Sequence, residues 1–136
     1  MKTEYAYIAG LFDGEGTIHI SNQLYLAARL RNTNRLTLEW IQRLYGFGHI
    51  YSDTRRVRPC YSLEFASNQA LEFLKPLLPY LRIKKTQANL AFKFQKRESN
   101  PQSSGYPLYP SEETKRKYIY EQMKQLNHPI IPFGTH

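Results

Sequence analysis

Two carboxylates lie in a glycine-rich run near the start of the chain, Ile8-Ala9-Gly10-Leu11-Phe12-Asp13-Gly14-Glu15-Gly16. The residues before Gly16 are expected to form a short helix, so Glu15 would lie at its C-terminal end, where the helix macrodipole disfavours an anion. Two such carboxylates, from two copies of the helix, would repel each other, and a divalent cation between them would remove that repulsion. Divalent ions held by carboxylates can activate water and stabilise an anionic transition state. Glu15 is therefore the first candidate for a metal ligand and catalytic residue.

Small residues recur along the same predicted helix. Ala6, Gly10 and Gly14 are spaced by four and would form one face with almost no side chain. Glycine inside a helix is unfavourable by roughly 1 kcal/mol relative to alanine, and that penalty is understandable if another helix backbone packs against the face. Since the chain holds one such helix, the partner would be a second copy related by a two-fold axis. Asp13 falls near this face and is expected to make a hydrogen bond at the dimer interface rather than take part in catalysis.

The run from Ile8 to Gly16 resembles the motif of the LAGLIDADG homing endonucleases, and it occurs once. The resemblance points to the single-motif branch, whose members act as homodimers. It implies an α+β unit with the order helix, two strands, helix, two strands, helix, in which an antiparallel saddle of strands lies along the DNA major groove. It also implies intron homing by a metal-dependent double-strand break in a long pseudo-palindromic target, with Mg²⁺ or Mn²⁺ as cofactor. Glu15 falls on the family's metal-binding position, where aspartate is common and glutamate is an accepted variant.

Two further catalytic candidates come from the resemblance. The run from Leu81 to Leu90 resembles a segment of some single-motif members in which a lysine lies just before a Q-A-N-L helix. Lys84 matches that lysine, and a cation there could stabilise transition-state charge or orient water. Lys85 is its competitor, and a solvated lysine at a helix start is the alternative. Family members also place a polar side chain after the second strand, near the attacking water. Asn32 is preferred for that role because Asn34 fits better as a helix N-cap.

Apolar residues alternate with arginine, aromatic and other polar residues along the predicted strands, as in a half-buried sheet. On a saddle, the polar side would face DNA, where arginine reads guanine and Gln, Ser and His read several base edges. An ordinary solvated face is the alternative, but the excess of arginine over acid favours DNA. The candidate DNA-binding residues are His19, Ser21, Gln23, Tyr25, Arg29, Arg31, His49, Tyr51, Asp53, Arg55, Arg56, Arg58, Ser62 and Glu64.

The elements that must position these residues follow from periodicity, caps and turn residues. Helices are predicted at about 3–14, 34–45, 68–75, 85–97 and 111–126, and strands at about 17–22, 24–31, 48–53 and 60–66. Residues 1–99 would form the endonuclease core. Residues 100–136 would add a loop, a C-terminal helix and a proline-rich tail packed on the same domain.

Composition agrees with a nucleic-acid partner. The chain has 136 residues, which suits one domain, and its net charge of +8 favours a polyanion. The single Cys60 excludes an internal disulfide and fits a reducing compartment. The four histidines lack zinc-ligand spacing. Neither a signal peptide nor a membrane span is visible, so we expect an intracellular protein without membrane contact or small-molecule cofactor. Mitochondrion, chloroplast and bacterial or phage cytoplasm all remain open.

The alternative function is a nucleic-acid-binding protein that does not cleave. Relatives of the fold include intron RNA maturases and DNA-binding regulators that have lost cleavage. An intact Glu15 with a basic residue expected nearby argues for cleavage, and a dual role stays open.

Overall fold

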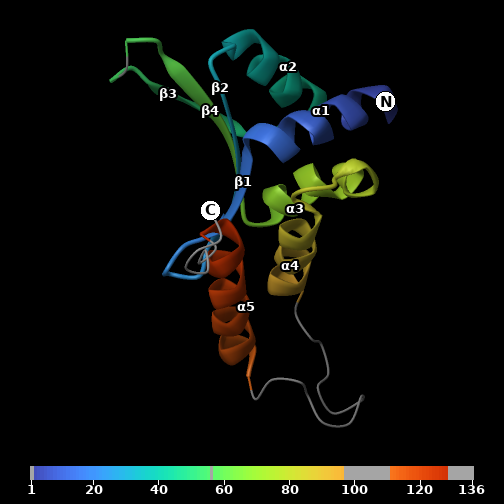
Figure 1. Cartoon of the computed structure of the whole chain (residues 1–136), viewed down its shortest axis with the longest axis vertical. Helices are drawn as coiled ribbons and strands as arrows, with labels where there is room; N and C mark the ends of the chain where they lie inside the picture. Colours follow the sequence, from blue (N-terminus) through green and yellow to red (C-terminus); the bar gives the residue numbers. More distant parts are fainter. Residues whose placement is uncertain (1, 56, 97–110, 129–136) are drawn as a thin grey trace, which may run out of the picture.

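The computed structural model describes residues 2–55, 57–96 and 111–128 (Figure 1). In chain order the elements are α1 (Lys2–Glu15), β1 (Gly16–Ile20), β2 (Leu26–Asn32), α2 (Arg35–Tyr45), β3 (His49–Asp53), β4 (Cys60–Ala66), α3 (Asn68–Leu74), the 3₁₀ helix η1 (Lys75–Tyr80), α4 (Lys85–Gln95) and α5 (Glu112–Asn127). The predicted helix-strand-strand-helix-strand-strand-helix order is therefore confirmed. No described helix has the length and hydrophobicity that a membrane crossing requires.

The four strands form one antiparallel sheet in the order β1-β2-β4-β3. Helices α1 to α4 gather on one side of the curved sheet, and the β3–β4 hairpin extends beyond them (Figure 1). α5 packs against α4 and the edge strand β1. One face of the sheet is thus covered by helices, and the other is left for a partner or solvent.

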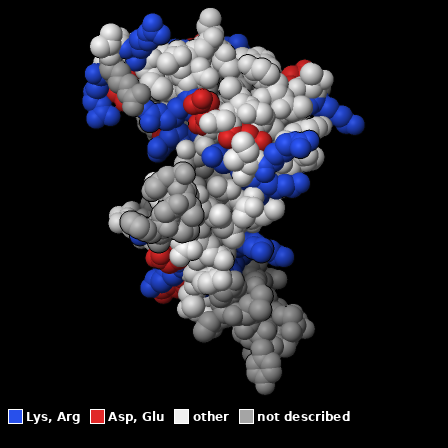
Figure 2. Space-filling model, viewed as in Figure 1, with Lys and Arg blue, Asp and Glu red and all other residues white. Residues whose placement is uncertain are grey.

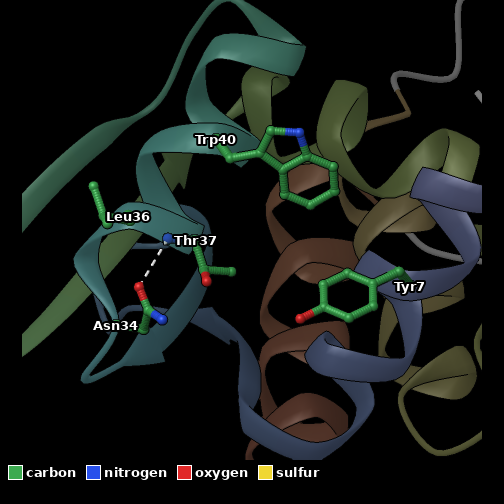
Figure 3. A pocket seen from close by; sticks show the side chains of 5 residues that line it. All are labelled: Tyr7, Asn34, Leu36, Thr37 and Trp40. Atoms are coloured by element: carbon green, nitrogen blue, oxygen red, sulfur yellow. Dashed lines mark hydrogen bonds between the residues drawn. The ribbon is translucent and has the colours of Figure 1, made fainter.

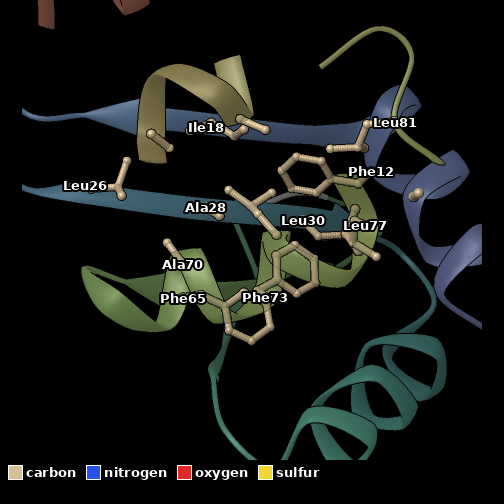
Figure 4. Close-up of a cluster of buried hydrophobic side chains, with 14 of the residues drawn as sticks. Phe12, Ile18, Leu26, Ala28, Leu30, Phe65, Ala70, Phe73, Leu77 and Leu81 are labelled. Atoms are coloured by element: carbon tan, nitrogen blue, oxygen red, sulfur yellow. The ribbon is translucent and has the colours of Figure 1, made fainter. Parts of the chain in front are cut away.

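The core lies between the sheet and these helices (Figure 4). Alternation along β1 and β2 places Ile18, Ala28 and Leu30 in it with no exposed surface. From the other side come Phe12 of α1 and Phe73 of α3, whose rings meet edge to face at 5.5 Å. These aromatic contacts fix how the start and the middle of the chain pack together.

The predicted helix boundaries at α2 are confirmed by their caps. The Asn34 side chain accepts a hydrogen bond from the backbone N–H of Thr37 at 3.2 Å. Gly46 ends the helix with φ of 84°, a left-handed conformation that glycine adopts without a steric penalty. Ser111 caps α5 in the same way as Asn34 caps α2.

The predicted strands at 17–22 and 24–31 are too long at the turn between them. The Leu24 N–H donates to the Ser21 carbonyl at 2.8 Å, and the Tyr25 N–H donates to the Ser21 hydroxyl at 3.1 Å. These bonds close a tight turn in which Leu24 has φ of 65°. Ser21, Gln23 and Tyr25, expected on the outward face of strands, are therefore loop residues. The reason is that the Tyr25 N–H bonds to the nearby Ser21 side chain, and regular pairing of the two strands ends at Ile20 and Leu26.

α5 is joined to the sheet by a polar contact as well as by packing. The side-chain amide of Asn127 donates to the carbonyl of Ile18 at 2.7 Å, and Ile119 and Met123 are buried in the core. The C-terminal helix is thus part of the same packed unit. The loop and the proline-rich tail predicted on either side of it lie outside the described residues.

Candidate nucleic-acid and metal site

Glu15 lies at a rigid junction between α1 and β1. It is the last residue of α1 and is exposed, and the next residue, Gly16, is buried and begins β1. A Cβ atom at Gly16 would overlap the ring of Phe12. The junction therefore requires glycine, and the close contact fixes the point from which the Glu15 carboxylate projects.

Asp13 makes a different set of contacts from the expected one. Its carboxylate accepts hydrogen bonds from the backbone N–H groups of Arg82, Ile83 and Lys84, at 2.9, 3.2 and 2.9 Å. These N–H groups belong to the three residues just before α4, where a carboxylate satisfies otherwise unpaired donors and complements the helix dipole. The hydrogen bonds of Asp13 are found within the chain, and the contact at a dimer interface that we expected of it stays a prediction.

The Asp13 bridge brings two predicted catalytic residues to the same corner of the molecule. It joins the end of α1, which carries Glu15, to the backbone of Lys84. Lys84 is half-buried, whereas Lys85 is exposed and begins α4. Among the described residues, the Asp13 carboxylate bonds to the backbone of residues 82–84 and not to that of Lys85. The backbone of Lys84 is therefore fixed to α1, and the choice between the two lysines stays a prediction.

Asn32 ends β2 and has a clear local role. Its side-chain oxygen accepts a hydrogen bond from the N–H of Asn34 at 2.8 Å. This bond turns the chain from β2 into α2, so at least one polar atom of Asn32 is used structurally.

The outward face of the sheet collects most of the predicted DNA-binding residues. Arg29 lies opposite Glu64 in β4, which in turn lies opposite His49 in β3. Arg31 and Tyr51 flank Ser62 in the same manner. Because side chains alternate across a strand, these residues share the face that the helices leave uncovered.

Acidic residues on this face orient the arginines. The Arg29 guanidinium bonds to the Glu64 carboxylate. Asp53 lies 3.9 Å from Arg31 and 3.1 Å from Arg55, and its hydrogen bond and charge raise the pKa of the Arg55 guanidinium. Pairs this exposed contribute little to stability, so their main effect is on side-chain direction. Arg58 is exposed on the same hairpin, and Arg56 lies outside the described residues. Lys and Arg side chains are visible around the hairpin in Figure 2, with acidic residues among them.

Four residues that face the same surface were not among the predicted ones. Thr17 shares the parity of His19 in β1 and lies opposite Arg29, so strand alternation could have identified it. Ala27, Ala66 and Gln69 line a hollow at the edge of this face, together with the buried Phe65. Alanine carries no sequence signal for recognition, and Gln69 belongs to a helix rather than a strand.

The small-residue face of α1 is open in the single chain. Ala6, Gly10 and Gly14 are exposed, and a Cβ atom added at either glycine would meet nothing within 4 Å. Beside it, Tyr7 is 57 % exposed and meets the Trp40 ring edge to face at 6.0 Å.

An open pocket adjoins this face between α1 and α2. It has a volume of about 440 Å³ and is lined by Tyr7, Asn34, Leu36, Thr37 and Trp40 (Figure 3). Leu36 is 74 % exposed. The open face of α1 and the neighbouring apolar side chains Tyr7 and Leu36 are thus both exposed in the single chain.

The described residues of one chain offer only part of the ligand set that a metal ion needs. No group of three His, Cys, Asp or Glu side chains suited to a metal occurs within the described residues. The Asp13 oxygens accept three N–H groups, which leaves Glu15 as the carboxylate available at this corner. Glu15 fits a hard divalent cation if further oxygen ligands come from outside the chain.

Solved structures show the same fold. The homing endonuclease I-CvuI, in complex with its target and calcium, matches with a TM-score of 0.71 and 22% identity over 92% of this chain and 82% of that one. The archaeal intron-encoded homing endonuclease I-Vdi141I, complexed with DNA, matches with a TM-score of 0.72 and 17% identity over 95% and 87%. The LAGLIDADG homing endonuclease I-SmaMI matches with a TM-score of 0.62 and 15% identity over 88% of this chain and 43% of that one.

No protein-family model and no curated protein sequence matches the chain. At identities of 15 to 22%, the structural likeness establishes the fold. The α+β homing-endonuclease architecture predicted from the single motif is thereby confirmed over nearly the whole chain.

Proposed function

We propose, from the fold that this chain shares with LAGLIDADG homing endonucleases, that it is a site-specific homing endonuclease that cuts both strands of DNA. The observation that carries the proposal is the Asp13 bridge, which holds the Glu15 end of α1 against the Lys84 segment. An exposed carboxylate can hold a metal ion that hydrolyses a phosphodiester, and a lysine and an arginine-bearing sheet face can bind the phosphates of DNA.

Double-stranded DNA is the proposed substrate. The uncovered sheet face presents Arg29 and Arg31 with His49 and Tyr51, and the whole chain carries a charge of +8. Arginines positioned by acids can read guanine edges, and the surplus positive charge favours contact with phosphates. The neighbours I-CvuI and I-Vdi141I were solved with DNA, which supports the same class of partner here.

Divalent-metal dependence is part of the proposal, with Mg²⁺ or Mn²⁺ as the working ion. Complexes of I-CvuI contain Ca or Mg. Glu15 would hold the ion, which supplies Lewis-acid activation of water and stabilisation of transition-state charge. Lys84 would stabilise negative charge on the scissile phosphate. The polar side chain of Asn32, at the end of β2, would help to position the attacking water.

A homodimer is the proposed working form. The open face of Ala6, Gly10 and Gly14, bordered by the exposed Tyr7, would pack against the same face of a second copy in an isologous contact. Two Glu15 carboxylates would then lie at two adjacent helix ends, one for each DNA strand. We place the protein in a reducing intracellular compartment, which suits its single cysteine, Cys60.

The function is tested by selecting cleaved sites from a randomised duplex DNA library with purified protein in magnesium. Enrichment of one long, roughly palindromic sequence, lost with Glu15→Gln, supports the endonuclease. The alternative is a non-cleaving intron RNA maturase or DNA-binding regulator. Sequence-specific binding of DNA or intron RNA with no cut product in magnesium or manganese would favour that alternative.

A further inference from the structure

A hollow opens from the uncovered sheet face at the edge of β4, where its pairing with β3 ends. Ala27 of β2 and Ala66 of β4 are direct partners in the ladder there. The hollow has a volume of about 380 Å³ and is also lined by Phe47, Gly48, His49, Tyr51, Glu64, Phe65 and Gln69.

The two alanines end at Cβ, while the neighbouring side chains of this face are longer. The next pair of the same ladder on this face, to one side of the alanines, is Arg29 and Glu64, whose side chains bond to each other. The apolar part of its lining, here called the floor, is Ala27, Ala66, Phe47 and Phe65, and the polar part, here called the rim, includes His49, Tyr51, Glu64 and Gln69. No Lys or Arg lines it, so it is a poor phosphate site.

Most polar groups at the rim already have partners. Glu64 binds Arg29, and the rings of His49 and Tyr51 lie against each other with centroids 4.2 Å apart. Gln69 is different, since it is exposed in the first turn of α3 and no hydrogen bond joins its side chain to another described residue. Its amide offers one acceptor and two donors beside an apolar floor.

Resting on the proposed function, we infer that this hollow reads one T·A base pair in each half of the DNA target. The thymine 5-methyl group contacts the Ala27 and Ala66 methyls, and the Gln69 amide bonds to adenine N7 and N6, a pairing that glutamine makes in the major groove. A cytosine in place of thymine would face its N4 donor towards alanine methyls without a partner, which is unfavourable.

The ladder also predicts where this base pair lies relative to another contact. Ala27 and Arg29 are two residues apart on one strand, a separation of roughly 7 Å at about 3.4 Å per residue. Base pairs are stacked at about 3.4 Å. A strand lying along the groove therefore puts the T·A pair about two base pairs from the guanine that Arg29 would read.

The test uses the full chain and two randomised duplex libraries, one with thymine and one with deoxyuridine in its place. The wild type should select thymine at one position per half-site. Removing that single methyl group from the selected site should weaken binding about fourfold, because one buried methyl is lost. The variant Ala66→Val fills the hollow and should bind the thymine and uracil sites equally.

The variant Gln69→Ala should lose the preference for adenine opposite that thymine and keep the preferences elsewhere. Gln125→Ala removes the same group from an exposed position of α5 and should change nothing. Two results would overturn the inference and leave the proposed function standing. One is a selected site at which no position is sensitive to uracil. The other is a uracil sensitivity that survives in Ala66→Val together with an adenine preference that survives in Gln69→Ala. A wild type that selects no DNA sequence overturns the proposed function and the inference together.

Discussion

Asp13 and Glu15 are two residues apart, yet the fold uses them differently. A helix turns by about 200° over two residues, so one carboxylate faces its own chain and the other does not. Asp13 accepts three backbone N–H groups of residues 82–84, while Glu15 is exposed at the end of α1. Substitution of Glu15 is therefore expected to affect cleavage and not stability, whereas substitution of Asp13 is expected to lower stability.

We expect Glu15→Gln to abolish cleavage in magnesium and to leave DNA binding and the free energy of unfolding nearly unchanged. The substitution keeps the size of the side chain and removes the charge that a hard cation needs. Nicking of a target plasmid and a gel-shift titration measure the two properties. A variant that cuts at close to the wild-type rate would show that Glu15 is not the metal ligand.

Asp13→Ala should lower the free energy of unfolding by roughly 1–3 kcal/mol, because N–H groups at the start of α4 lose a charged acceptor. Cleavage should fall as well, since Lys84 is no longer held to α1. Urea denaturation checks stability, and Asp13→Asn should recover part of it. Unchanged stability in Asp13→Ala would contradict a supporting role for the bridge.

At the scale of elements, α1 has one buried side and one open side. Ile8, Ala9 and Phe12 are fully buried against the sheet and helices, whereas Gly10 and Gly14 face open space. The open side therefore accepts larger side chains in an isolated chain, so any penalty they cause must come from a second molecule.

Gly10→Leu should convert the protein to a monomer and abolish double-strand cutting while each chain stays folded. Sedimentation gives the mass, and a thermal melt checks the fold. Gly16→Ala is the contrasting variant, because its Cβ would overlap the Phe12 ring and should destabilise the chain itself. A wild type that sediments as a monomer both free and on DNA would refute the dimer.

Among the strand residues, Arg29→Ala should change base preference at particular positions of the target. Its guanidinium is oriented by Glu64 on the uncovered face. Lys93→Ala removes the same charge from an exposed position of α4 and should affect all sequences alike or not at all. Arg116 is less suitable as a control, since it lies 4.4 Å from the Phe94 ring and supports packing. Equal loss on every sequence for Arg29→Ala would rule it out as a base reader.

At the scale of the whole molecule, the two faces of the sheet have different surroundings. Helices α1 to α4 cover one side of the sheet (Figure 1), and α5 braces the edge strand β1 through the Asn127–Ile18 hydrogen bond. A sheet stiffened from one side can present its other side as a fixed surface. The single-domain arrangement predicted for the complete chain, including the loop after the core and the proline-rich tail, stays a prediction.

DNA binding should weaken steeply with salt, because a chain with a charge of +8 releases counterions from the phosphates it contacts. If a dimer makes six to ten phosphate contacts, affinity should fall by roughly 10³–10⁵ between 50 and 200 mM salt. A fluorescence titration across that range measures the slope. A flat response would exclude a phosphate-dominated interface.

The sequence alone determined those features that depend on neighbours within a turn or along a strand. Periodicity located the helices and strands, Asn34 and Gly46 marked the ends of α2, and one glycine-rich motif indicated the fold. The strands on either side of Ser21 were predicted too long at the turn, because the backbone N–H groups of Leu24 and Tyr25 bond to Ser21 and the turn extends over residues 21–25.

Only the tertiary structure decided which distant residues meet. Asp13 and Lys84 are 71 residues apart, and their contact depends on how η1 and α1 pack. The pairing of Ala27 with Ala66 likewise follows from the order β1-β2-β4-β3, in which β2 and β4 are neighbours. Such contacts are set by the burial of a shared core, to which every element contributes, and no local pattern specifies them.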